Sequence, residues 1–533
     1  METPVRRGWC AAFCGVVVIG LGCSAEPDSG AEAVALVKSE LISGASGVGT
    51  IDVSSVSADW NTTAWQSESV GVSVGFWQYV AYNAEDTNPA HVQYITTSTL
   101  DSSGRPFVDR VVCPGASNIG TNFEDPNEDD DYVDAHLLPA TPDSVGLPIN
   151  WGDPAMYGFD GYVWVSSLRV PSDRIKAVSN YTVNGAKCLR TSDAPGSPYA
   201  VSISSALAGA CVFAAHEAVD PAPFVTAHCF RRQNGVDSAS GNDFFDGGDL
   251  FPWGEDSDNS LFASYWDTVT NTLAMYRHYL ETPIDTGWAP VPGDTGVHIV
   301  GHPLLASNDD SLFILAPSGG TNLSVWKYSG GGFSAGTVVA TDLYQGEVEL
   351  KDNVTEVRGV NFAMQYIWNG TPARLAVVYQ SRSGSGVRTT LKLLLCDPVT
   401  LACTNPVVLG NSTYDAFMPA LAIGPNKTGS HYVNVLSYWS NQTTSGANTV
   451  LRYMTYTTTG SSTSSVSITA SQRDCPADGV GYWGDYDKMW STSTVFSRGI
   501  TDSTDKTCDT TSRANLDFKP QDQHVAVVNF QVP

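Results

Sequence analysis

The sequence predicts an all-β protein, a β-propeller of four-stranded antiparallel blades, with seven blades favoured and six to eight allowed by the length. Composition is the first observation: 49 Gly and 29 Pro stand among 533 residues and only 16% of residues are charged, which disfavours long helices. The second is the pattern of apolar residues, which from Trp60 onward form short runs bounded by turn-forming residues, as strands do. With 42% hydrophobic residues the chain can also bury a large core.

These runs recur on a common plan. Residues 67–83 and 418–440 each contain two apolar strands separated by a turn and end in an aromatic residue followed by a polar one. Radial repetition of such units protects sheet edges, as in a propeller. Looser versions of the plan are expected to begin near Tyr157, Ala200, Asp256, His302, Val360 and Gly481.

Two other all-β architectures fit the sequence less well than a propeller. Tandem immunoglobulin-like sandwiches would be joined by recognisable linkers, and none interrupts residues 60–533. A β-helix would show shorter and stricter coils. The last strand is expected at 524–532, and the sequence leaves open whether it joins the first blade or the last one.

The N-terminal segment resembles an export signal. Arg6 and Arg7 precede an apolar stretch, residues 11–21, that is too short to span a bilayer. The end of this stretch resembles a bacterial lipobox in which Cys23 would carry the lipid, and the alternative is ordinary cleavage after Ala25. The prediction is an outer-membrane or cell-surface lipoprotein, or a secreted protein.

Three parts of the chain are expected. Residues 1–23 form the signal peptide, the small and polar residues 24–50 form a flexible tether, and residues 51–533 form a single propeller domain.

Eight cysteines follow the lipobox, an even number that fits disulfide bonds in an oxidising compartment. No Cys-x-x-Cys pair is present, so a zinc site is disfavoured. A Pro-containing turn separates Cys396 from Cys403, which predicts a hairpin closed by a disulfide. Chain proximity suggests the remaining pairs, which are Cys211 with Cys229, Cys475 with Cys508, and Cys113 with Cys188.

The formal net charge of −27 argues against a surface that binds nucleic acid or an anionic membrane, so membrane contact is expected through the lipid anchor only. No nucleotide or organic cofactor is expected, because the dinucleotide, phosphate-loop and zinc-protease motifs are absent. Two acidic loops, 124–134 and 243–258, are either solvated or neutralised by a cation. In the second loop, Asp256, Asp258 and Asn259 have a spacing compatible with calcium.

Two segments resemble the secreted bacterial sialidase-like, or BNR-repeat, β-propellers. Residues 68–74 form a Glu-led first strand, and residues 481–486 form a late turn containing Gly-Asp-Tyr, as in that family. The resemblance implies a propeller fold and a glycan as the ligand class. The Asp-box of the family is only approximated, at 57–65, and the Phe-Arg-Ile-Pro signature of true sialidases is absent, so fold is implied more strongly than activity.

Catalytic candidates come from two chemistries. A sialidase needs three arginines around a carboxylate, and four arginines fall on different expected blades: Arg190, Arg277, Arg358 and Arg452. A polysaccharide lyase needs His, Tyr and Arg, which concentrate at Tyr276, Arg277 and His278. If this segment is a strand, Tyr276 and His278 share one face and Arg277 lies on the other. The alternative is a structural strand with mixed faces.

Aromatic residues give a separate signal for carbohydrate. Trp483, Asp485 and Tyr486 combine flat rings with a carboxylate, and such groups stack on sugars and accept hydroxyl hydrogen bonds. The alternative is that these rings fill the packing between blades.

Three functions follow from the sequence. The leading one is an exported, lipid-anchored propeller that binds an extracellular polysaccharide or glycoconjugate. The alternatives are a polysaccharide lyase or glycosidase on the same propeller, and a scaffold for a surface protein complex. The side chains that converge on the central funnel should discriminate among them: three arginines for a sialidase, His with Tyr and Arg for a lyase, and aromatic residues for a lectin.

Overall fold

The chain divides into two compact units, Met1–Leu36 and Val37–Pro533, and the described residues all lie in the second. The computed structural model describes residues 49–52, 65–74, 77–85, 91–100, 106–112, 149–159, 161–171, 181–183, 186–188, 209–216, 225–231, 245–255, 258–279, 287–345, 348–350, 355–357, 360–382, 389–409, 415–441, 448–468, 472–473, 488–492, 494–502 and 524–533. No helix among these residues is long and apolar enough to cross a membrane.

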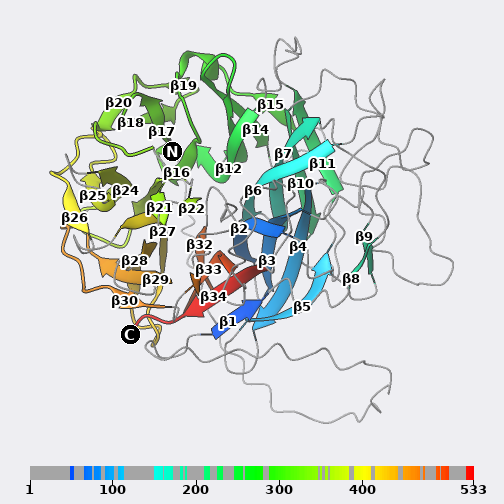
Figure 1. Cartoon of the computed structure of the whole chain (residues 1–533). Coiled ribbons are helices and arrows are strands. Elements are labelled where there is room, and N and C mark those ends of the chain that lie inside the picture. Colours follow the sequence, from blue (N-terminus) through cyan, green and yellow to red (C-terminus); the bar gives the residue numbers. More distant parts are fainter. Residues whose placement is uncertain are drawn as a thin grey trace, which may run out of the picture. The chain divides into compact units, whose positions relative to one another are not determined.

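The described residues form seven antiparallel sheets of four or five strands, which succeed one another along the chain (Figure 1). The first sheet contains β2 (Trp65–Val74), β3 (Trp77–Glu85), β4 (His91–Leu100) and β5 (Pro106–Val112). The second contains β6 (Ile149–Phe159), β7 (Tyr162–Pro171), β10 (Gly209–His216) and β11 (Val225–Arg231). The third contains β12 (Phe245–Glu255), β13 (Asp258–Asp267), β14 (Thr272–Tyr279) and β15 (Trp288–Pro290).

The later sheets repeat this order. The fourth contains β16 (Leu304–Asn308), β17 (Ser311–Gly319), β18 (Asn322–Ser329), β19 (Gly332–Phe333) and β20 (Thr337–Ala340). The fifth contains β23 (Phe362–Ile367), β24 (Arg374–Arg382), β25 (Thr389–Cys396) and β26 (Val407–Leu409). The sixth contains β27 (Ala416–Pro425), β28 (Tyr432–Asn441), β29 (Asn448–Tyr456), β30 (Val466–Ser467) and β31 (Gln472–Arg473).

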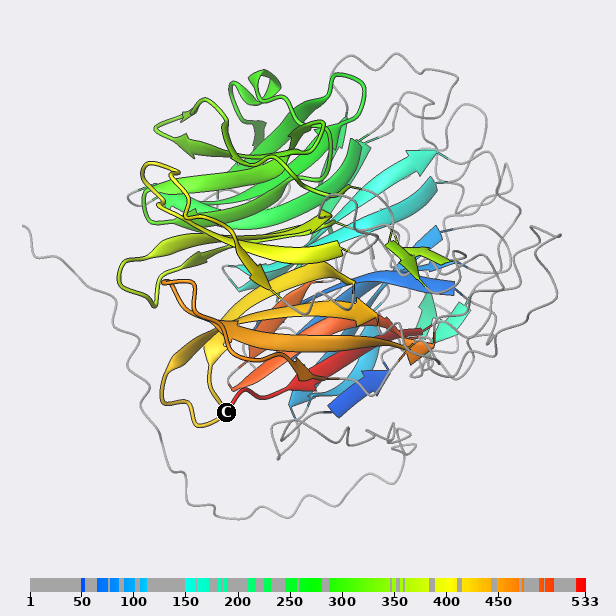
Figure 2. The same cartoon turned by 60° about the vertical axis from the view of Figure 1, so that its left-hand side comes forward.

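The seventh sheet joins the two ends of the described chain. It contains β32 (Met489–Thr492), β33 (Val495–Asp502), β34 (His524–Phe530) and, beside β34, the early strand β1 (Gly49–Asp52). Figure 2 shows the red β34 next to the blue β1. The closing strand β34 therefore belongs to the last sheet, which the sequence left open. The early strand β1 begins two residues before residue 51, where the propeller domain was expected to start.

Three short elements lie outside the seven sheets. Two are hairpins, β8 (Tyr181–Val183) with β9 (Ala186–Cys188) and β21 (Val348–Leu350) with β22 (Thr355–Val357). The third is a 3₁₀ turn, η1 (Asp294–Gly296).

The innermost strand is the first strand in each of the first six sheets, and it is β32 in the seventh. Each innermost strand contacts the innermost strands of the two neighbouring sheets. β2 contacts β6, β6 contacts β12, and the series continues through β16, β23 and β27 to β32, which contacts β2. A closed ring of innermost strands, each followed outward by its own antiparallel sheet, is a β-propeller. The prediction of an all-β propeller is confirmed.

The hydrophobic core lies between successive sheets. Trp164 of β7 packs with Tyr265 of β13, for example, and Phe417 of β27 packs with Phe496 of β33. The middle strands are buried on both faces, and β17 accordingly shows the nearly continuous apolar run Leu-Phe-Ile-Leu-Ala. Ring closure thus replaces a single central core with a core at each interface between blades.

One expected repeat was wrong. The apolar run near Ala200 does not begin a sheet, because β10 pairs with β7 on one side and β11 on the other and is the third strand of its blade. The long connection after β7 separates this run from its sheet along the chain, which made it resemble a new unit. Asp256 lies outside the described residues, and the sheet expected to begin near it begins earlier, at Phe245 of β12.

Several innermost strands carry a β-bulge near their beginning. The register shifts between Ser67 and Val70 in β2, between Gly152 and Ala155 in β6, between Asp246 and Gly248 in β12, and between Phe417 and Ala420 in β27. Within three of these bulges one residue has a positive φ: Asp153 at 49°, Gly247 at 53° and Met418 at 47°. Bulges bend a strand and re-aim its side chains, so these positions shape the wall of the propeller axis.

A disulfide joins Cys396 to Cys403, as the hairpin pattern predicts. In the backbone register of β10 and β11, Cys211 lies opposite Cys229, and Cys188 ends β9. The other three paired positions, Cys113, Cys475 and Cys508, lie outside the described residues, as does Cys23.

We expect the double substitution Cys396→Ser with Cys403→Ser to lower the free energy of unfolding by up to about 2.5 kcal/mol, the loop-closure value for so short a loop. The turn itself should persist, because Asp397 Oδ1 accepts hydrogen bonds from the backbone N–H of Val399 and Thr400. Urea unfolding measures the loss, and Val399→Ser in the same exposed turn is the control. A loss equal to that of the control would contradict the expectation.

Candidate functional site

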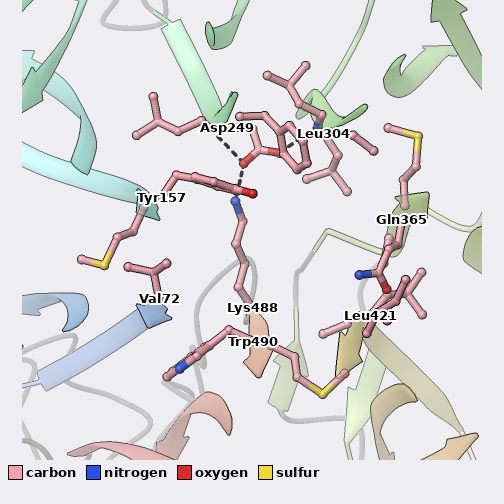
Figure 3. A pocket seen from close by; sticks show the side chains of 18 of the residues that line it. Val72, Tyr157, Asp249, Leu304, Gln365, Leu421, Lys488 and Trp490 are labelled. Atoms are coloured by element: carbon pink, nitrogen blue, oxygen red, sulfur yellow. Dashed lines mark hydrogen bonds and ion pairs between the residues drawn. The ribbon is translucent and has the colours of Figure 1, made fainter. Parts of the chain in front are cut away.

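A cavity of about 500 Å³ lies on the propeller axis, and all seven innermost strands contribute to its wall. Its wall combines polar side chains with aromatic and aliphatic ones, the aromatic ones including Tyr157, Phe251, Phe362, Tyr366, Trp368 and Trp490. Pockets of this size with a few placed polar groups are the usual form of a small-molecule site. The cavity is therefore the candidate functional site (Figure 3).

An ion pair crosses one side of the cavity. Lys488, which directly precedes β32, donates to Asp249 Oδ1 of β12. The Asp249 carboxylate is almost fully buried and also accepts hydrogen bonds from the backbone N–H of Leu250 (3.0 Å) and of Leu305 (2.8 Å) in the next blade. A buried carboxylate needs such partners, because burying an unpaired charge is costly. The pair also ties the third blade to the seventh.

The Tyr157 ring of β6 lies beside this ion pair, with its hydroxyl directed toward Lys488 and Asp249 (Figure 3). Burial, and secondarily the negative charge of Asp249, raise the pKa of Tyr157 to about 12. Both effects disfavour the phenolate. Near neutral pH Tyr157 is therefore a hydrogen-bond donor rather than a base.

This raised pKa predicts a pH dependence of stability. Because the folded-state pKa of Tyr157 exceeds the ordinary value of 10, its contribution to stability is complete below pH 10 and is lost as pH rises toward 12. We expect the free energy of unfolding to fall less between pH 10 and 12 in Tyr157→Phe than in the wild type, by about 2 kcal/mol. Urea unfolding at several pH values measures this, with the exposed Tyr432→Phe as control. Equal losses in all three proteins would contradict the assignment.

His302 closes the wall next to the ion pair. Its Nε2 lies 3.1 Å from both the backbone nitrogen and the backbone oxygen of Gly248. The ring lies against Gly247, where an added Cβ would come within 2.0 Å of Nδ1. Gly247 also has φ of 53°, so the bulge of β12 needs glycine there for two reasons. His302 thus fixes the local backbone as well as lining the cavity.

The side-chain amide of Gln365 lies on the opposite side of the cavity. In Figure 3 the Gln365 side chain of β23 turns its nitrogen toward the open space. Its Oε1 is buried and has no partner among the described residues. The Gln365 amide therefore supplies a donor to whatever occupies the cavity.

Trp490 forms a flat part of the wall. Its indole lies against Gly71 of β2, where an added Cβ would come within 2.3 Å of the ring. Only 8% of Trp490 is exposed, and it lines the cavity. A glycine in the neighbouring blade thus lets the ring lie flat at the axis.

No arginine lines the cavity among the described residues. The nearby Arg498 of β33 is fully buried and donates to Ser437 Oγ and to the backbone oxygen of Met418. Of the four arginines that the sequence suggested for a sialidase triad, Arg277 and Arg452 lie on the third strands β14 and β29. Arg190 and Arg358 lie outside the described residues.

The predicted catalytic segment is the third strand of its blade, and none of its three residues lines the cavity. Tyr276 stacks on Phe230, and His278 packs between the rings of Trp164 and Trp288. Arg277 lies on the other face, where Nε donates to Ser260 Oγ. The alternation of faces is as predicted, and the segment matches the alternative of a structural strand.

The remaining predicted site residues are only partly described. Trp483, Asp485, Tyr486 and Asp256 lie outside the described residues. Asp258 and Asn259 begin β13, opposite Glu255 and Gly254. Among the described residues no group of three or more His, Cys, Asp or Glu side chains could hold a metal ion.

The sequence did not indicate that the residues lining the cavity come together in one site. Asp249 falls within the acidic loop 243–258 and Tyr157 at the expected start of a repeat, and neither pattern indicates a shared cavity. The usable signal was position, because each residue lies in or directly before the first strand of a repeat, and first strands face the propeller axis.

No protein-family model matches the chain, and no curated protein matches it. Among solved structures, the six-bladed fucose-binding lectin of Aleuria aurantia is similar at 10% identity, over 69% of this chain and 91% of the lectin, with a TM-score of 0.35. The α-L-arabinanase of Penicillium chrysogenum has 11% identity, over 72% and 93%, with a TM-score of 0.38. The sialidase of Trypanosoma rangeli has 9% identity, over 73% and 54%, with a TM-score of 0.37. At these values the likenesses do not bear on ligand or chemistry.

Proposed function

We propose that this protein binds a neutral glycan in the cavity at the propeller axis. The observation that carries the proposal is the composition of the described wall, in which aromatic rings and hydrogen-bonding groups line the same cavity. Sugars present apolar C–H faces and hydroxyl edges, so rings and polar groups together match them. Trp490 offers a ring, Gln365 and Tyr157 offer donors, and Asp249 offers an acceptor.

The charges favour a neutral ligand over an acidic one. Asp249 and Lys488 compensate each other across the cavity, and the described wall contains no arginine to hold a carboxylate or sulfate. The chain also has a net charge of −27, which repels polyanions. A sialic acid or a uronic acid therefore fits the described wall less well than a neutral sugar.

Binding is favoured over catalysis by the same residues. Glycosidases usually use two carboxyl groups on either side of the scissile bond, and the described wall contains one, Asp249. Lyase chemistry needs a base and a group that neutralises a uronate carboxylate; the pKa of Tyr157 is about 12, and the described wall, which includes His302, contains no arginine. A lyase or glycosidase is the alternative function, and it requires further groups beyond the described wall.

Export, a lipid on Cys23 and calcium at the β12–β13 hairpin remain proposals from the sequence. Export would place the glycan that the protein binds outside the cell. Metabolic labelling with a fatty acid tests the lipid: the wild type should incorporate label and Cys23→Ala should not.

The function is tested by binding and product assays on one protein sample. Neutral and acidic oligosaccharides are screened by calorimetry, and the best-bound neutral sugar is then incubated with the protein and assayed for new reducing ends and for ultraviolet-absorbing product. Binding without product supports the proposal. Product formation would support the enzyme, preference for an acidic sugar would overturn neutrality, and binding to no sugar would overturn the function.

A further inference from the structure

Two aromatic side chains are unusually exposed where the cavity meets the surface. Trp368 follows the end of β23 and is 54% exposed, yet it also belongs to the cavity wall. Tyr432 begins β28 in the next blade and is 50% exposed. The two rings are in contact, with centroids 4.8 Å apart and planes at 65°. We call Trp368 and Tyr432 the rim pair.

The rim pair is held by more than ring contact. Asn369 Nδ2 donates to the backbone oxygen of Tyr432 at 3.2 Å, which ties the hairpin after β23 to the strand of the next blade. Because this side-chain hydrogen bond holds the residue after Trp368 to the backbone of Tyr432, the rings are positioned before any ligand arrives. Positioned rings lose little freedom on binding, which favours affinity.

The exposure of the rim pair is unlike that of other exposed apolar residues in the described chain. Those residues are valines and Tyr279, and Tyr279 has the guanidinium of Arg277 over its ring, 4.2 Å from the centroid. Among the residues that the structure describes, only the rim pair brings two exposed aromatic rings into contact. Contiguous exposed aromatic surface marks interaction sites.

The rim pair is continuous with the cavity along one strand. Gln365 and Trp368 are three residues apart, about 10 Å at the rise of an extended strand. Since Gln365 faces the cavity and Trp368 is half in solvent, a ligand that spans both must be longer than one sugar ring. A linear chain of several sugars has this form.

We propose that the rim pair is a second sugar platform and that the ligand is a neutral oligosaccharide chain, one end of which occupies the cavity while the next residues lie on Trp368 and Tyr432. This rests on the proposed function, and it adds the length of the ligand and the direction in which it leaves the cavity. The chemistry is stacking of C–H faces on the two rings, without any covalent step.

The experiment compares short and long chains of one sugar. The best-bound neutral series is used as its disaccharide and its hexasaccharide, with affinities measured by calorimetry for the wild type, Trp368→Ala, Tyr432→Ala and Tyr279→Ala. The last variant removes an aromatic ring that is 42% exposed and lies on β14 of the third blade rather than on the fifth or sixth. Circular dichroism checks that each variant is folded.

We expect the wild type to bind the hexasaccharide more tightly than the disaccharide. Tyr432→Ala, which is outside the described cavity wall, should weaken hexasaccharide binding about fivefold and change disaccharide binding less than about twofold. Trp368→Ala should weaken hexasaccharide binding about tenfold and disaccharide binding by a smaller factor, because Trp368 also lines the cavity. Tyr279→Ala should change neither. Equal affinity of the wild type for both lengths, or equal losses for both lengths in Tyr432→Ala, would overturn the rim platform while leaving cavity binding intact. Binding of neither sugar would overturn the proposed function instead.

Discussion

Removal of the Trp490 ring is expected to weaken glycan binding by about 30-fold, or about 2 kcal/mol, the size typical of a buried aromatic anchor. The ring lies against Gly71 and lines the cavity, where it offers an aromatic surface to a sugar. Trp490→Leu is the appropriate change, because it keeps apolar volume between the blades and removes the flat face. Calorimetry with the best-bound neutral sugar measures the loss.

Two further variants separate binding from stability. Trp326 of β18 is as buried as Trp490, at 7% against 8%, but it does not line the cavity, so Trp326→Leu should lower stability without changing affinity. Gly71→Ala keeps the Trp490 ring but displaces it, because the new Cβ would meet the ring at 2.3 Å. It should therefore weaken binding as well. If Trp490→Leu and Trp326→Leu bound the sugar equally well, the anchor role would be wrong.

Asp249→Ala is expected to lower the free energy of unfolding by about 3–5 kcal/mol, the cost of breaking a buried ion pair from one side. The change leaves Lys488 without its carboxylate and removes the acceptor of the buried Leu305 N–H, which is bound at 2.8 Å. It should also abolish measurable sugar binding, because the third and seventh blades lose their link across the cavity. Urea unfolding and calorimetry report the two effects separately.

A double-mutant cycle identifies the source of that cost. Asp249→Asn keeps a side-chain oxygen that can accept from Leu305 and removes the charge, and Lys488→Met removes the opposite charge. If the ion pair dominates, the two losses should be strongly non-additive, and the double variant should be more stable than their sum implies.

The pair formed by Lys392 and Asp342 on the exposed side of the fifth blade is the matched control. Asp342→Ala should cost less, because Asp342 is 42% exposed. Additive losses would contradict the link.

Local patterns in the sequence predicted the parts that depend on neighbouring residues. Period-two alternation placed Tyr276 and His278 on one face of a strand, and the turn between Cys396 and Cys403 predicted a closed hairpin. Both follow from the chemistry of a few consecutive residues. The propeller itself was predictable because each repeat is a local unit.

The cavity could not be predicted in the same way, because its residues meet only when the ring closes. Asp249 and Lys488 are 239 residues apart in the chain, and neither has a local feature that points to the other. The catalytic assignment at Tyr276, Arg277 and His278 relied on residue types alone. Which strand of the blade a segment forms decides whether it reaches the axis, and residue type does not carry that information.

The pairing of β1 with β34 has a consequence for synthesis of the protein. The seventh blade combines residues 49–52 with residues 524–530, so its sheet is complete only after residue 530 has been translated. Until then β1 and β33 both present an unpaired edge, which is surface prone to aggregation. Pairing of strands so far apart in the chain is slow, so closure of the ring should follow the synthesis of β34. A nascent chain truncated before residue 524 should remain bound to chaperones.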